Sequence, residues 1–184
     1  MKKVSYLLSM IVFALSFSQA PVNGQITPAP IPKAITNSAT TDYSLLIENE
    51  DGRQIKLKPA DLSKIKRQNV KVSDHGKEVT FEGYALVEVL KLASIEFGEA
   101  LRGKRLATFL LVEAADNYQA VFALPELDPA FTDKVVLLAD RRDGQPLSKT
   151  EGQLRLVVPD DKRAARWVRQ VTGMKILRAT NSNK

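Results

Sequence analysis

Between residues 44 and 177, the sequence contains a succession of short runs that are either apolar or alternate between apolar and polar residues. Turn-forming residues separate these runs. Ile55 and Leu57, for example, alternate with polar residues, which is the period of a half-buried strand. The pair Asp143-Gly144 is typical of a tight turn between two strands. Strands are therefore expected over residues 44–48, 55–57, 70–72, 79–81, 106–115, 118–122, 135–139, 154–158 and 174–177. Many short strands with few helices predict an α+β fold with a mixed, mostly antiparallel sheet.

The clearest predicted helix covers residues 86–93, where apolar residues recur every three or four positions. Glu88 and Lys91 fall on the opposite, polar side, so we expect one face of this helix to pack against the sheet. Shorter helical turns are expected at residues 59–62, at 124–127 and within 160–168. The helices are thus predicted to be few and short.

The first 24 residues have the pattern of a secretory signal peptide. Lys2 and Lys3 precede an uncharged run over residues 4–17, which is shorter than the ~20 residues that span a bilayer. Cleavage after Ala20 or after Gly24 would both fit, and an uncleaved membrane anchor is the alternative. A Pro- and Thr-rich tether is expected over residues 25–41 and a globular domain over 42–180. The sequence therefore predicts an exported protein, periplasmic or extracellular, with no membrane span after cleavage.

The composition excludes several classes of site. The chain has no Cys, so disulfides, thiolate metal sites and Cys nucleophiles are excluded, and its single His excludes a cluster of His metal ligands. The formal net charge of +6 is modest and only 7% of the residues are aromatic. A nucleic-acid-binding protein would be expected to show clustered basic and stacking residues. We therefore expect no nucleic-acid partner.

A basic run follows the predicted strand 154–158. It contains Lys162, Arg163, Arg166 and Arg169. If this segment is helical, Lys162, Arg166 and Arg169 share one side, and Arg guanidinium groups match the oxygens of phosphate or sulfate. The alternative is a solvated surface neutralised by the two preceding aspartates. The run is therefore a candidate site for a small anion or for an anionic cofactor.

Two further residues are candidates for the same site. Trp167, the only Trp of the chain, lies within the basic run, and Arg142 stands just before the Asp143-Gly144 turn. Trp167 could form part of a ligand wall, although a lone Trp more often fills a core. Arg142 could clamp an anion or belong to a charged turn. Both alternatives stay open for each residue.

The C-terminal part of the chain resembles the oxidoreductase molybdopterin-binding domain, which has the fold of the sulfite oxidase family. The resemblance rests on the run G-Q-L-R-L-V-V-P at residues 152–159, followed by Lys162-Arg163 and by Arg166-Trp167-Val168. Weaker matches at residues 81–90, 116–127 and 138–147 occur in the family's order. The resemblance implies that the basic run lies beside the cofactor and the anionic substrate. It therefore implies that Lys162, Arg163, Arg166 and Trp167 would bind the cofactor molybdopterin, with Arg142 as a further candidate nearby.

One departure from the family pattern bears on function. Enzymes of this family hold molybdenum through a cysteine thiolate, and this chain has no Cys. We therefore expect a non-catalytic module that binds a small anion, a pterin or a protein partner. One alternative is a molybdopterin-dependent oxidoreductase with an oxygen ligand such as Asp or Ser. The other is a purely structural or interaction domain, because fold does not imply function.

Overall fold

The computed structural model describes residues 43–179. The predicted signal peptide and tether lie outside the described residues. No helix within the described range is long and apolar enough to cross a membrane. Within residues 43–179 the two α-helices are α1 (Pro59–Leu62) and α2 (Leu86–Leu92), and short 3-10 turns interrupt several loops.

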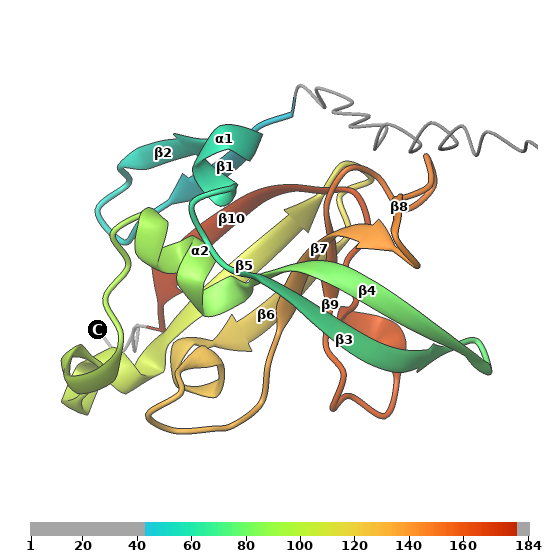
Figure 1. Ribbon diagram of the computed structural model, residues 1–184. Coiled ribbons are helices and arrows are strands. Elements are labelled where there is room, and N and C mark those ends of the chain that lie inside the picture. The colour runs from blue at the N-terminus through green and yellow to red at the C-terminus, as the bar shows by residue number, and fades with distance from the viewer. Residues whose placement is uncertain (1–42, 180–184) are drawn as a thin grey trace, which may run out of the picture. The chain divides into compact units, whose positions relative to one another are not determined.

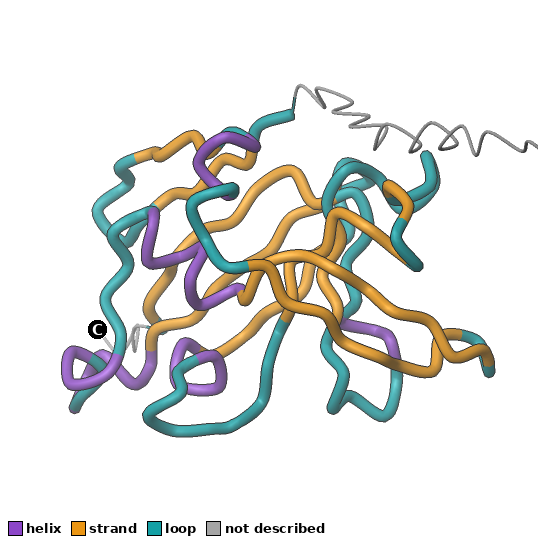
Figure 2. Tube along the Cα trace, in the orientation of Figure 1, coloured by secondary structure: helices purple, strands orange, loops and turns teal. Residues whose placement is uncertain are grey.

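Ten strands form two five-stranded sheets (Figures 1 and 2). The first sheet has the order β2-β1-β10-β5-β6, and the second has the order β3-β4-β7-β8, with β9 paired to β7. The strands are β1 (Leu45–Glu48), β2 (Gln54–Leu57), β3 (Arg67–Asp74), β4 (Lys77–Ala85), β5 (Thr108–Ala114), β6 (Gln119–Ala123), β7 (Leu137–Arg142), β8 (Gln145–Pro146), β9 (Arg155–Val157) and β10 (Val171–Arg178). Only the β1–β10 pair among these is parallel. The predicted α+β class with a mixed, mostly antiparallel sheet is confirmed.

Strand β5 illustrates how sequence pattern and burial are related. The run over residues 106–115 is nearly all apolar, yet its side chains alternate between buried and half-buried positions within β5. Leu110 and Val112 face the core and are fully buried. The strand begins only at Thr108, because residues Gly103–Ala107 form a 3-10 turn. One face of this sheet therefore packs in the core and the other is partly exposed to solvent.

Helix α2 follows β4 directly and buries the face that the sequence predicts. Its first backbone N–H, that of Leu86, donates a hydrogen bond to the carbonyl of Val136. Leu86, Val89 and Leu90 are fully buried, whereas the side chains of Glu88 and Lys91 form an exposed ion pair. Burial of such a face, rather than intrinsic propensity, stabilises a helix this short.

Gly83 in β4 is required by a close approach of two strands. A Cβ atom built there would lie 2.1 Å from the carbonyl oxygen of Leu138 in β7, and the register of β4 and β7 shifts between Glu82 and Gly83. We expect Gly83→Ala to lower the free energy of unfolding by about 1–3 kcal/mol, because β4 must move away from β7. Urea denaturation measures this change.

Gly173 in β10 provides the matched control. A Cβ atom there would meet nothing closer than Glu113 Oε2 at 3.5 Å, an ordinary contact. Gly173→Ala should therefore leave the urea midpoint unchanged or raise it slightly. Equal midpoints for the two variants would contradict this explanation of Gly83.

Candidate functional site

The basic run predicted from the sequence lies in the loop between β9 and β10. Ala164–Arg166 forms a single 3-10 turn, so Lys162, Arg166 and Arg169 do not share a helix face. The Tyr118 hydroxyl donates a hydrogen bond of 2.6 Å to the carbonyl of Ala165. This bond fixes the loop against the turn that joins β5 to β6.

Arg166 is held between two carboxylates. Its Nε and Nη2 donate to the two carboxylate oxygens of Asp161 at 2.9 and 2.8 Å, and its Nη1 donates to Glu126 Oε1 at 3.0 Å. The guanidinium also lies 4.7 Å from the centre of the Phe122 ring. The hydrogen bonds to Asp161 and Glu126 outweigh partial burial and raise the pKa of Arg166 above its ordinary value. The donors of Arg166 are thus largely satisfied within the protein itself.

A second set of charges lies where β7, β9 and the end of β3 meet, and we call it the arginine cluster: Asp74, Arg142, Glu151 and Arg155. Arg142 is half-buried and the other three residues are buried. Arg155 Nη1 donates to Glu151 Oε1 at 2.6 Å and lies 3.4 Å from Asp74 Oδ2. Arg142 Nη1 lies 3.1 Å from the same Asp74 oxygen and 3.2 Å from Glu151 Oε1. Two guanidinium groups therefore face two carboxylates, and the cluster is formally neutral.

Glu151 is buried and remains charged because of its neighbours. Burial alone would raise the pKa of this carboxyl, but hydrogen bonds from Ser148, Arg155 and Arg142 outweigh burial and hold the pKa below its ordinary value. The Ser148 hydroxyl donates at 2.8 Å to Glu151 Oε2, the oxygen that the arginines leave open. Glu151 is thus a fixed anion within the fold.

Aromatic rings enclose the arginine cluster. The guanidinium of Arg155 lies 4.9 Å from the centre of the Phe81 ring and 5.6 Å from that of Trp167. Trp167 is 7% exposed, and its Nε1 donates to the carbonyl of Val158 at 2.9 Å. The two rings meet edge to face with centroids 6.2 Å apart. Trp167 therefore packs in the core beside the cluster.

A small cavity, which we call the loop pocket, opens beside Trp167. Its volume is about 240 Å³, and its lining includes Tyr118, Arg155, Trp167 and Arg169, together with Asp116 and the two alanines of the 3-10 turn. Arg155 Nε is buried and has no hydrogen-bond partner among the described residues. Arg169 is exposed. The loop pocket is thus lined by Arg155, which keeps one unpaired N–H, and by the exposed guanidinium of Arg169.

The structure brings together only part of the predicted set. Trp167 lines the loop pocket, whereas Arg142 does not line it and shares the carboxylates of the arginine cluster with Arg155. Lys162 and Arg163 are exposed and do not line the loop pocket, and Arg166 contacts carboxylates instead. The sequence interpretation missed Arg155. The sequence did contain a signal for this residue, because Arg155 is the single charged residue within the apolar run L-R-L-V-V.

Comparison with known proteins identifies the family of this chain. The family model described as oxidoreductase molybdopterin binding domain matches residues 74–184. The crystal structure of the sulfane dehydrogenase SoxCD from Paracoccus pantotrophus is similar in fold, with a TM-score of 0.56 and 21% identity over 76% of this chain. The chain spans 39% of the length of that SoxCD chain. No curated protein matches.

The family match covers more than half of the chain. The likeness to SoxCD supports the sulfite oxidase-like fold that the C-terminal motif implied. The chain therefore belongs to the oxidoreductase molybdopterin binding domain family.

Proposed function

We propose that this chain is an exported, non-catalytic binding module of its family that holds a small anion in the loop pocket. The observation that carries the proposal is that one cavity is lined both by Arg155, whose buried Nε has no described partner, and by the exposed Arg169. Lys2, Lys3 and the apolar run that follows them support export.

The residues of this chain do not fit the metal centre of the family's enzymes. That centre needs a thiolate, and the chain has no Cys. Within residues 43–179, no group of three or more His, Asp or Glu residues is placed to hold a metal. Arg142 and Arg166, two of the candidate cofactor-binding residues, already bind carboxylates of this same chain. The family's redox chemistry therefore has no support in these side chains.

The size and charge of the loop pocket favour a small anion. Its volume of about 240 Å³ lies below the ~300 Å³ at which pockets for drug-sized ligands begin. Two guanidinium groups and one carboxylate line it, and the Asp116 carboxylate already accepts a hydrogen bond of 3.0 Å from the Tyr118 backbone N–H. Guanidinium N–H groups suit sulfate, phosphate or a short carboxylate.

Thermal unfolding with added sulfate or phosphate tests this site. With the anion at about ten times its Kd, the melting temperature should rise by about 3–6 °C relative to chloride of equal ionic strength. The Arg169→Gln variant should lose most of this rise.

Arg163→Gln is the matched control, because Arg163 is exposed, carries the same charge and lies in the same loop outside the loop pocket. Sulfate also stabilises proteins non-specifically through exclusion from their surface. Equal anion-dependent shifts in both variants would therefore contradict the proposed site, and no shift with any anion would favour a pure interaction domain.

A further inference from the structure

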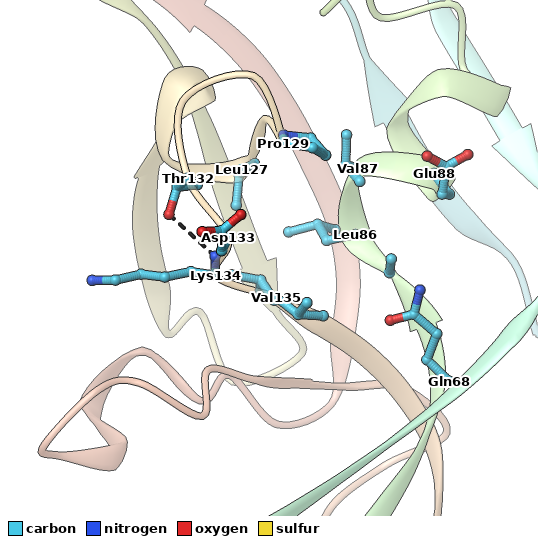
Figure 3. A pocket seen from close by; sticks show the side chains of 12 residues that line it. Gln68, Leu86, Val87, Glu88, Leu127, Pro129, Thr132, Asp133, Lys134 and Val135 are labelled. Atoms are coloured by element: carbon cyan, nitrogen blue, oxygen red, sulfur yellow. Dashed lines mark hydrogen bonds between the residues drawn. The ribbon is translucent and has the colours of Figure 1, made fainter.

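Two cavities adjoin each other on the side of the molecule where α2 begins. The first, of about 270 Å³, lies between the start of α2 and the loop that leads into β7 (Figure 3). The second, of about 510 Å³, lies between residues 64–68 and the exposed side of α2. Gln68 and Glu88 line both cavities. We call the two cavities together the amphipathic groove.

The first cavity is mainly apolar. Leu86 and Val87 reach it from α2, and Leu127, Pro129 and Val135 reach it from the opposite loop (Figure 3). Val135 remains 37% exposed although it is apolar. Gln68 and Glu88 stand on one side of this cavity, and the polar residues 132–134 stand on the other side (Figure 3). An apolar chain could therefore lie here out of water.

The second cavity is basic. Lys64, Lys66 and Lys91 line it, against the single carboxylate of Glu88. Lys91 pairs with Glu88 at 2.8 Å, and Lys64 pairs with Asp61 at 2.9 Å. Lys66 is exposed and forms no ion pair within the described part of the chain. This end of the groove therefore has a positive charge available to an anionic group.

We infer that the amphipathic groove binds a single-chain anionic amphiphile. The apolar chain lies against Pro129 and Val135, the exposed apolar residues of the first cavity, and the anionic head lies beside Lys66. The commitment to an anionic head rests on charge complementarity with the lysine end of the groove. Gln68 lines both halves of the groove. The inference is independent of the loop pocket, whose lining residues are all different.

Isothermal titration of the full-length protein with octanoate and decanoate, below their micelle concentrations, tests the inference. Binding should be saturable at one molecule per chain. Decanoate should bind about fifteenfold more tightly than octanoate, because each of its two additional methylenes adds roughly fourfold in affinity when buried. Octanol, which lacks the charge, should bind more weakly than octanoate. Absence of saturable decanoate binding, or equal affinity for octanol and octanoate, would overturn the inference.

Substitutions in each of the two cavities test where the head and the chain of the ligand lie. Lys66→Gln should weaken decanoate binding by about fivefold, whereas Lys104→Gln, which removes an exposed charge outside the groove, should not change it. Val135→Asn should weaken decanoate more than octanoate, whereas Val121→Asn, on the exposed face of β6, should affect neither. Equal effects of each variant and its control would show adsorption to the surface and would overturn the inference.

Discussion

Replacement of Arg155 by glutamine is expected to lower the free energy of unfolding by about 3–5 kcal/mol. Arg155 is 1% exposed and faces the carboxylates of Asp74 and Glu151, which are 4% and 7% exposed. Removing one partner of a buried ion pair leaves an uncompensated charge, which costs far more than the intact pair contributes. Arg142 stays beside both acids, so we expect a loss near the lower end of this range.

Guanidinium chloride denaturation measures this loss of unfolding free energy in Arg155→Gln, and we expect the m-value to be the same as that of the unsubstituted protein. Arg102→Gln is the matched control, because its side chain is 68% exposed and pairs only with Glu99, three residues away. Such surface pairs contribute about 0–1 kcal/mol. A loss of less than about 1 kcal/mol in Arg155→Gln would mean that the arginine cluster does not stabilise the folded state as described.

Replacement of Trp167 by alanine is expected to cost a similar amount, about 3–5 kcal/mol. The side chain fills a site between Phe81 and Arg155, so its removal leaves a cavity and uncovers the buried cluster. Trp167→Phe keeps most of the volume but removes the hydrogen bond from Nε1 to the Val158 carbonyl, and it should cost about 1–3 kcal/mol.

The order of the two Trp167 variants is the informative result. Thermal or urea denaturation should place Trp167→Phe between the unsubstituted protein and Trp167→Ala. Phe131→Ala, at a side chain 52% exposed, should change stability by less than about 1 kcal/mol. If Trp167→Ala lowers the free energy of unfolding as little as Phe131→Ala does, Trp167 belongs to a ligand wall rather than to the core.

Local sequence patterns predicted the strands and helices well, because each such pattern needs only neighbouring residues. The alternation at Ile55 and Leu57 corresponds to β2, and the periodic run that starts at Leu86 corresponds to α2. The segment 106–115 begins as a 3-10 turn before β5, which its nearly continuous apolar residues did not indicate. Boundaries of this kind depend on tertiary packing.

The partners of the charged residues could not be predicted from the sequence. Arg155 meets Asp74 from 81 positions away, and Arg166 meets Glu126 from 40 positions away. A local sequence pattern does not show which distant residues pair. The sequence therefore could not distinguish an Arg166 that pairs with a carboxylate of the same chain from an Arg166 that binds an anion. The lone charge at Arg155 within an apolar run was a signal that the sequence interpretation missed, since a buried charge needs a partner.

Two features support the proposal that this family member binds its ligand without the family's metal centre. The chain lacks the thiolate, and two of its candidate arginines bind its own carboxylates within the fold. A cofactor phosphate would have to compete with Asp161 and Glu126 for Arg166. The central claim is therefore that the fold has been retained for binding without the redox metal.

Molybdenum per chain, measured by elemental analysis on protein purified from an export-competent host supplied with molybdate, tests that claim most directly. We predict a molybdenum content far below one atom per chain, with no pterin released on denaturation. One molybdenum per chain, accompanied by pterin, would contradict the account and would require an oxygen side chain or the dithiolene alone to hold the metal.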